Sequence, residues 1–167
     1  MPRHRTTRSN VEKDAIALLK EDHAKVRELL SKLEEAEGKS RETTLKTIEQ
    51  ELKIHTKIEE EIFYPAFRDA AEKEQDTELY YEALEEHHVV DMVVPEIMGT
   101  EPDAEQFTAK AKVLKDLVEH HAEEEEKEMF PRARKLMDKA QLLELGQQLA
   151  QAKESLRGAK VKELVRA

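Results

Sequence analysis

Apolar residues recur every three to four positions along four long segments of the chain, which is the spacing of a helix that buries one face. These segments run over about residues 11–36, 41–71, 77–98 and 103–137. Gly38 and Gly99 lie in the short breaks after the first and the third segment and suit helix ends there. Ser40 and Asp103 suit the N-cap positions of the helices that follow these two breaks.

Four helices of similar length, joined by short loops and each with a narrow apolar stripe, predict an all-α fold. The arrangement that this pattern favours is an antiparallel up-down-up-down four-helix bundle. A short extra C-terminal helix is predicted over about residues 139–156, with Asp138 and Gln141 as a capping box at its start. We expect this fifth helix to dock on the outside of the bundle, in one domain that spans residues 11–156.

The composition fits a helical bundle and excludes several other classes of protein. Charged residues make up 40% of the 167 residues, and four glycines and five prolines are too few turn formers for a many-stranded protein. The chain has no cysteine, which excludes disulfides, iron–sulfur clusters and thiol nucleophiles and disfavours a structural zinc site. It contains neither an apolar run near the roughly 18 residues of a membrane span nor a signal-peptide pattern. We therefore expect a cytoplasmic protein that does not enter a membrane.

The net charge of −10 is unevenly distributed along the chain. Residues 1–10 carry +3 and residues 153–167 carry +3, which leaves −16 for the segment between them. We interpret residues 1–10 and 157–167 as short basic tails on an acidic body. An acidic body repels a phosphate backbone, so a nucleic-acid partner is not expected.

A histidine interrupts the apolar stripe near the middle of each of the four predicted helices. The four are His23, His55, His87 and His121. In an antiparallel bundle of equal helices the midpoints lie at similar heights, so we expect the four imidazoles to meet in one layer of the core. Buried histidines at matching heights indicate metal ligands more strongly than any one of them does alone.

The chain also contains an internal repeat that adds carboxylates to this layer. HTKIEEEIFYP at 55–65 matches HAEEEEKEMFP at 121–131, and each copy places a glutamate four residues after its histidine, at Glu59 and Glu125. Pro65 and Pro131 close the two copies and are predicted to bend or end the helix. Four imidazoles and two carboxylates from four helices match the ligands of dinuclear iron or manganese sites, since a carboxylate can bridge two cations.

These motifs resemble the hemerythrin-like family, also called HHE cation-binding domains. The resemblance covers about residues 12–152 and rests on LLKEDH, HTKIEEEIFYP, EEHHVV and HHAEEEEKEMFP in this order. It implies a four-helix bundle around two non-heme iron ions with an oxo or hydroxo bridge, and manganese or zinc fit less well. Carried over by motif position, the implied metal ligands are His23, His55, Glu59, His87, His121 and Glu125.

One position departs from the oxygen-carrying members of this family, which place a further histidine four residues after the histidine of the third helix. Here that position is Asp91, so one metal has a different ligand or an open position. Asp91, water or a nearby tyrosine could fill it. His88 and His120 lie off the stripes and are expected to face solvent or support the ligands, and Tyr64 is expected to pack in the core.

The resemblance implies a small-molecule ligand, which is oxygen, hydrogen peroxide or nitric oxide, bound by a monomer or weak homodimer. A binding protein and a peroxide-decomposing enzyme are both open, as is an iron- or oxygen-sensing or metal-storage bundle without turnover. No residue is singled out as catalytic. A ferritin-like carboxylate site is disfavoured because only Glu85 and His88 have the ExxH spacing, and a metal-free interaction bundle is the remaining alternative.

Overall fold

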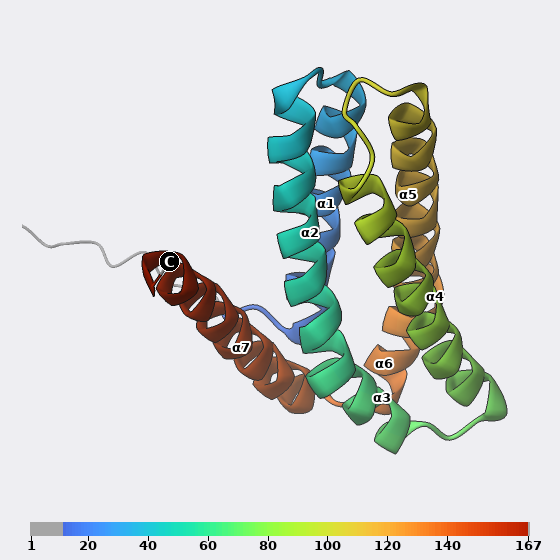
Figure 1. Ribbon diagram of the computed structural model, residues 1–167. Helices are drawn as coiled ribbons and strands as arrows, with labels where there is room; N and C mark the ends of the chain where they lie inside the picture. Colours follow the sequence, from blue (N-terminus) through green and yellow to red (C-terminus); the bar gives the residue numbers. More distant parts are fainter. Residues whose placement is uncertain (1–11, 167) are drawn as a thin grey trace, which may run out of the picture.

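The computed structural model describes residues 12–166, and these residues form helices with no strand. The chain is therefore an all-helical bundle, as predicted (Figure 1). The predicted N-terminal tail, residues 1–10, lies outside the described part. None of the described helices is long and apolar enough to cross a membrane.

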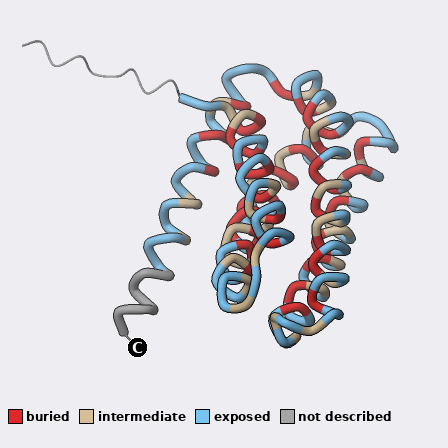
Figure 2. Tube along the Cα trace, turned by 90° about the horizontal axis from the view of Figure 1, so that it is seen from above, coloured by how far each residue is buried: buried red, intermediate tan, exposed pale blue. Residues whose placement is uncertain are grey.

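Four long helices make up the body of the bundle: α1 (Ala15–Glu35), α2 (Lys39–Ile58), α4 (Glu74–Met98) and α5 (Glu105–Glu124). Helix α1 packs against α2 and α5, and α4 packs against the same two helices, so the four enclose a common interior (Figure 1). Buried residues follow the inward-facing sides of these helices (Figure 2). The apolar stripes of the sequence thus became the inner faces of the bundle.

The second and fourth predicted segments are not continuous α-helices. Each contains a π-helical turn, η1 (Glu59–Phe63) and η2 (Glu125–Met129), followed by the short helices α3 (Tyr64–Ala70) and α6 (Phe130–Leu136). The backbone N–H of the first residue of α3 and of α6 donates to the carbonyl five residues earlier. A proline follows directly in both copies and has no N–H to donate, so the helix widens there instead of keeping its regular bonds.

The fifth helix, α7 (Lys139–Arg166), is longer than the sequence predicted. Its start is as expected: the backbone N–H of Asp138 donates to the Gln141 side chain at 2.8 Å, and Gln141 N–H donates to Asp138 Oδ1 at 2.8 Å. The predicted end at Leu156 is wrong, because helix formers continue to Arg166 and Gly158 costs only about 1 kcal/mol in a helix. The predicted C-terminal tail is thus helical through Arg166.

Helix α7 docks on α1 and α2 through a close approach of its backbone. A Cβ atom at Gly146 would lie 2.3 Å from the Lys13 carbonyl oxygen, so only glycine fits there. Leu142 and Leu149, on the turns before and after it, are buried. This contact fixes α7 against the start of α1, while its later turns extend away from the bundle (Figure 1).

Two predicted helix caps are wrong. Gly38 occupies the N-cap of α2 with a φ of 52°, a left-handed conformation that glycine adopts without strain, so the helix begins before Ser40. Ala104 occupies the N-cap of α5, one residue after Asp103, and no side chain bonds to this helix start. Neither change alters the inward faces of the two helices.

The apolar core is divided into two clusters. One holds Ile16, Leu19, Phe63, Phe67 and Phe130 among others, at the end of the bundle formed by the π turns, α3, α6 and α7. The other is built from α1, α2, α4 and α5 alone and holds the following residues: Val26, Leu30, Ile48, Val94, Phe107 and Leu114. Along each long helix, together with the π turn where one follows it, the buried histidine lies between residues of one cluster and residues of the other. The buried histidines and glutamates therefore form a polar layer between the two apolar clusters.

Candidate metal centre

The six predicted ligands are all buried and converge in this polar layer. Each of the four long helices contributes one histidine, and each π turn begins with one of the two glutamates. Their donor atoms gather in two groups, and Glu59 belongs to both. The six predicted ligands are the following: His23, His55, Glu59, His87, His121 and Glu125.

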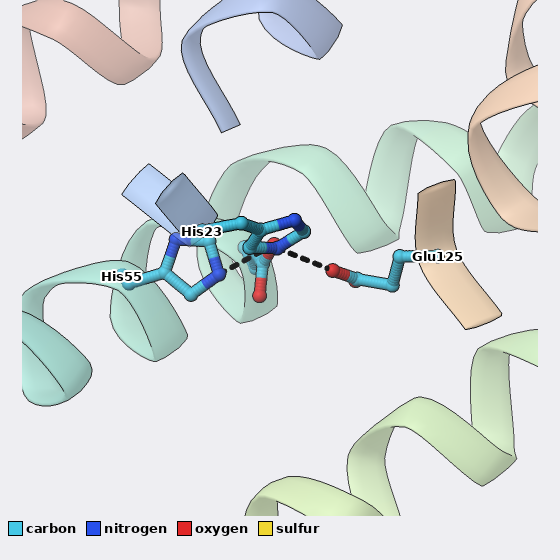
Figure 3. Close-up of side chains that lie close together, drawn as sticks. His23, His55 and Glu125 are labelled. Atoms are coloured by element: carbon cyan, nitrogen blue, oxygen red, sulfur yellow. Dashed lines mark ion pairs between the residues drawn. The ribbon is translucent and has the colours of Figure 1, made fainter. Parts of the chain in front are cut away.

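The first group, site A, consists of His23, His55, Glu59 and Glu125. His23 Nε2 lies 3.0 Å from Glu125 Oε2, and His55 Nε2 lies 3.1 Å from Glu59 Oε1. One donor atom of each of the four residues lies within 4.8 Å of the others. Figure 3 shows His23, His55 and Glu125 pointing toward one another from α1, α2 and the start of η2.

The second group, site B, consists of His87 and His121 together with Glu59. His87 Nε2 lies 3.2 Å from Glu59 Oε2 and 3.0 Å from His121 Nε2, and His121 Nε2 lies 3.6 Å from Glu125 Oε2. Glu59 therefore turns one carboxylate oxygen toward a histidine of each site. A carboxylate placed in this way could contact a cation in each group.

Four buried atoms of site A make no hydrogen bond with the described residues, and they are His23 Nε2, His55 Nε2, Glu59 Oε1 and Glu125 Oε2. Each imidazole nitrogen faces a carboxylate oxygen at 3.0 or 3.1 Å, but not in hydrogen-bonding geometry. Leaving a buried polar atom without a partner costs about 1–3 kcal/mol each, and folded proteins rarely accept four at one point. Each of these nitrogen and oxygen atoms offers a lone pair when it carries no proton. A cation between them could bind all four.

A second carboxylate contacts the outer nitrogen, Nδ1, of each of the four histidines. The partners lie 2.8 Å from His23 Nδ1, 3.3 Å from His55 Nδ1, 2.9 Å from His87 Nδ1 and 2.6 Å from His121 Nδ1, and they are, in this order, Glu126, Asp22, Glu60 and Glu86. A carboxylate at Nδ1 keeps the proton on that nitrogen and leaves Nε2 free to bind a metal.

The four outer carboxylates follow the internal repeat. Asp22 and Glu86 directly precede the histidines of α1 and α4, and each bonds the histidine of the next helix. Glu60 and Glu126 directly follow Glu59 and Glu125, and each reaches a histidine in the other half of the repeat. Sequence reasoning assigned no role to Asp22, Glu86 and Glu126, although their position directly beside the predicted ligands His23, His87 and Glu125 was the available signal.

The two sites differ in how their outer carboxylates are neutralised. Lys153 of α7 contacts Asp22, and Arg27 of α1 lies 3.0 Å from Glu126, so both outer carboxylates of site A pair with a cation. Among the described residues, no lysine or arginine pairs with Glu60 or Glu86 at site B. Glu86 has the exposed His120 at 3.5 Å, so the outer carboxylates of site B face an imidazole where those of site A face a lysine and an arginine.

Tyr64 reaches into the centre from the first residue of α3. Its hydroxyl donates to Glu125 Oε1 at 2.6 Å and lies 3.3 Å from Glu59 Oε2 and 3.2 Å from His87 Nε2. The π turn places Tyr64 five residues after Glu59 on the same inward side. Phe130 holds the equivalent place in the second copy and stacks on His23 at 5.8 Å, without a hydroxyl.

Comparison with known proteins agrees with this geometry. The family model of the hemerythrin HHE cation-binding domain matches residues 14–133. The chain belongs to this family. Two curated mycobacterial relatives, Rv2633c of Mycobacterium tuberculosis H37Rv and Mb2666c of Mycobacterium bovis, are each 31% identical to this HHE protein over 149 residues, which cover 87% of this chain and 89% of theirs.

A solved structure is similar over the same length. It is the crystal structure of a hemerythrin HHE cation-binding domain-containing protein from Mycobacterium kansasii, a homologue of Rv2633c. It shares 30% sequence identity with this HHE protein and a TM-score of 0.80, over 91% of this chain and 92% of that one. A match over nearly the full length includes α7 as well as the four long helices.

The remaining sequence candidates lie outside the centre of this HHE protein. Asp91 is exposed and belongs to neither site, so the suggestion that it binds metal is not supported by the structure. The inward stripe of α4 advances from His87 to Val90, and Asp91 lies about 100° further around the helix. His88 and His120 are exposed, as predicted.

The proton affinities of the ligands reflect their mutual contacts. Burial by itself would lower the pKa of His55, but Glu59 and Asp22 raise it to about 10. Burial opposes protonation of His121 as well, and Glu125 and Glu86 raise its pKa to about 9. Without metal, the negative charge of the surrounding carboxylates therefore favours the protonated form of these two imidazoles.

A small apolar cavity adjoins the four histidines on the side away from Tyr64. Its volume is about 20 Å³, close to that of a single water-sized probe. Apart from the imidazoles its walls are almost entirely apolar and come from the four long helices: Val26, Leu52, Val90, Val118 and Ala122, with Thr56. Space of this size and polarity suits a diatomic or similarly small neutral molecule.

Proposed function

We propose that this protein is a non-heme di-iron protein that reacts with a small oxidant at the centre formed by sites A and B. The observation that carries the proposal is the group of four buried donor atoms in site A without hydrogen-bond partners. The proximity of site B, which shares Glu59, supports a second ion. His23, His55, Glu59 and Glu125 would hold one ion, and His87, His121 and the two glutamates the other.

The donor set favours iron over the other divalent metals. Imidazole suits iron and zinc, and carboxylate oxygen suits the harder ions, so a mixture of both in a helical bundle matches dinuclear iron or manganese sites. A structural zinc site would be tetrahedral and closed, with thiolates as its usual ligands. When bound, two iron ions supply one-electron redox chemistry that none of the protein's own side chains at the centre provides alone.

Site B is the place where the oxidant would react. Each site has two imidazoles, but Glu125 Oε2 lies 3.0 Å from His23 Nε2 of site A and 3.6 Å from His121 Nε2 of site B. The position four residues after His87 offers no third imidazole. The Tyr64 hydroxyl lies beside this incomplete donor set and would complete it or supply a proton there. A phenol and uncompensated carboxylates favour the ferric state, which argues for reaction rather than reversible oxygen carriage.

The apolar cavity next to the histidines supports a small ligand. Its walls contain almost no polar surface, so it does not solvate an ion or hold a charged substrate. Oxygen, nitric oxide and hydrogen peroxide are each small enough to approach through it. The contacts between neighbouring helices also support the proposed antiparallel up-down-up-down order of the four long helices.

One set of measurements tests this function. Protein purified from iron-rich medium should contain close to two iron ions per chain. Mixing the reduced protein with oxygen in a stopped-flow instrument should oxidise it without a long-lived adduct, and the oxidised protein should consume hydrogen peroxide. A stable adduct that releases oxygen under vacuum would identify a carrier instead, and an intact fold without metal would overturn the di-iron proposal.

A further inference from the structure

The protein's three tyrosines lie in one row that leads from the candidate centre to the surface. The ring centroid of Tyr64 lies 6.4 Å from that of Tyr80, and the centroid of Tyr80 lies 5.0 Å from that of Tyr81. Tyr64 is fully buried, Tyr80 is partly buried, and Tyr81 is 56% exposed. We call these three residues the tyrosine row.

The inner end of the row touches the ligands directly. The ring of Tyr64 stacks on His87 at 5.4 Å, and its hydroxyl donates to Glu125 at 2.6 Å. The outer end is held by a cation: the Arg68 guanidinium lies 5.9 Å from the Tyr80 ring centroid and 6.0 Å from that of Tyr81. The positive charge of Arg68 beside the two rings disfavours a positively charged tyrosine radical. Tyr80 or Tyr81 would therefore lose its phenolic proton when it loses an electron.

Simple core packing does not account for the row, because the repeat offers a direct comparison. The repeat pairs Tyr64 with Phe130 of the second copy, and Tyr80 and Tyr81 with Ile16 and Ala17 of the first. These residues fill their half of the core with no phenol at all, and Ile16 and Phe130 are fully buried. All three oxidisable rings thus belong to site B, the site whose donor set is incomplete.

We propose that the tyrosine row is a one-electron relay between the di-iron centre and a reductant at the protein surface. The relay rests on the proposed function, because the oxidant that draws electrons through it is hydrogen peroxide reduced at the centre. Electron transfer weakens steeply with distance, and rings in near contact divide one long transfer into short ones. The exposed ring of Tyr81 is the point where a small reductant, a phenol or an enediol such as ascorbate, gives up one hydrogen atom.

The reaction balances in electrons and protons. Reducing one hydrogen peroxide to two waters takes two electrons and two protons; the electrons pass along the row in two successive rounds, and the protons come from solvent. In each round Tyr64 gives up an electron while its phenolic proton moves to Glu125, and the proton returns when Tyr80 gives Tyr64 an electron. Tyr81 restores the electron of Tyr80 and, being exposed, releases its own phenolic proton to solvent, so the protons released balance those taken up. Two reductant molecules each lose one hydrogen atom to Tyr81, which completes the cycle.

The test uses the iron-loaded protein and reads the tyrosines themselves. Peroxide added without a reductant should produce a tyrosyl radical in rapid-freeze electron paramagnetic resonance, and oxidation or dityrosine cross-links at Tyr81 in mass spectrometry. Tyr80→Phe should keep the iron content but reduce oxidation at Tyr81 to the level seen without peroxide. Tyr81→Phe should abolish ascorbate-dependent reduction, and Tyr81→Trp, which restores an oxidisable ring, should recover it.

The outcomes separate the relay from the di-iron proposal. If the protein holds iron and consumes peroxide but Tyr81 is oxidised equally in Tyr80→Phe, the relay is wrong and the centre stands. If Tyr81→Phe retains the full ascorbate-dependent rate, the surface end of the relay is wrong. If the protein holds no iron or does not consume peroxide, both proposals fail together.

Discussion

Lys153 on the last helix contacts Asp22 on the first, and Asp22 in turn lies 3.3 Å from Nδ1 of His55, a predicted ligand of site A. The fifth helix is therefore connected to the candidate centre through two side chains. Burial would raise the pKa of Asp22, but His55 and Lys153 lower it, so the carboxylate is ionised. Helix α7, which the sequence places outside the bundle, thus supplies the positive charge that pairs with the carboxylate beside His55.

We expect Lys153→Met to destabilise the protein and to lower the reduction potential of site A. The buried Asp22 would lose a charged hydrogen bond, which is worth about 1.5–3 kcal/mol. Without the ammonium group Asp22 would draw the His55 proton more strongly, and a more electron-rich imidazole favours ferric iron. Denaturant unfolding and redox titration measure the two effects.

Lys25→Met is the matched control for this substitution. Lys25 also lies on the outside of the bundle and pairs with Glu51 at 2.8 Å, but it is largely exposed and touches no ligand partner. An exposed ion pair is worth only about 0–1 kcal/mol. Equal losses of stability and equal potentials in the two variants would show that Lys153 does not act through Asp22.

We expect Gly146→Ala to displace α7 and to weaken metal binding. The new methyl group would meet backbone atoms of Lys13, Asp14 and Ala15 at less than 3.0 Å, and backbone cannot move aside as a flexible side chain can. Moving α7 also withdraws Lys153 from Asp22. Gly158→Ala, in the same helix with nothing within 4 Å, should instead stabilise the helix by up to about 1 kcal/mol. Thermal unfolding and iron content of both variants check this, and an unaffected Gly146→Ala protein would refute the docking contact.

Replacing one of two adjacent histidines distinguishes the ligand from its neighbour. His121→Ala removes a buried donor of site B and should lower the iron content below two per chain, whereas His120→Ala should leave it unchanged. His120 is 65% exposed and pairs with Glu124 at 3.2 Å on the outer surface. Elemental analysis of the two purified variants decides the register. If His120→Ala lost iron and His121→Ala did not, the assignment of His121 to the centre would be wrong.

The stability of the metal-free protein should fall as the pH rises above neutrality. His55 and His121 have pKa values of about 10 and about 9 when folded, raised by their carboxylate partners against the effect of burial. In the unfolded chain the value is near 6.5. The stabilisation is thus complete below about pH 6.5 and is lost as the pH rises toward 9 and 10.

The metal-loaded protein should show the opposite trend over the same range. Metal must displace the protons of His55 and His121, so binding tightens as the pH rises. Melting curves at several pH values, with and without a chelator, give the pH dependence of the melting temperature for the metal-free and the metal-loaded protein. A chelated protein that becomes more stable between pH 7 and pH 9 would contradict the proposed protonation of the two imidazoles.

The sequence alone determined the helices and six candidate ligands. Apolar spacing is a local property, and a histidine at a stripe position must face the core of whatever bundle forms, which holds for His23, His55, His87 and His121. The four-residue step to each glutamate is fixed by helix geometry as well. The family resemblance rested on these same local motifs, and the family match over residues 14–133 confirmed it.

The tertiary structure decided which side chains support those ligands. Glu126 and His23 are 103 residues apart, and Lys153 and Asp22 are 131 apart, so no local pattern announces that they touch. The ring of Tyr64 packs in the core as expected, but the π turn brings its hydroxyl to Glu59 and Glu125. The register of α4 leaves Asp91 exposed. Periodicity predicts which face of a helix is buried, but the packing of the helices against one another determines what that face meets.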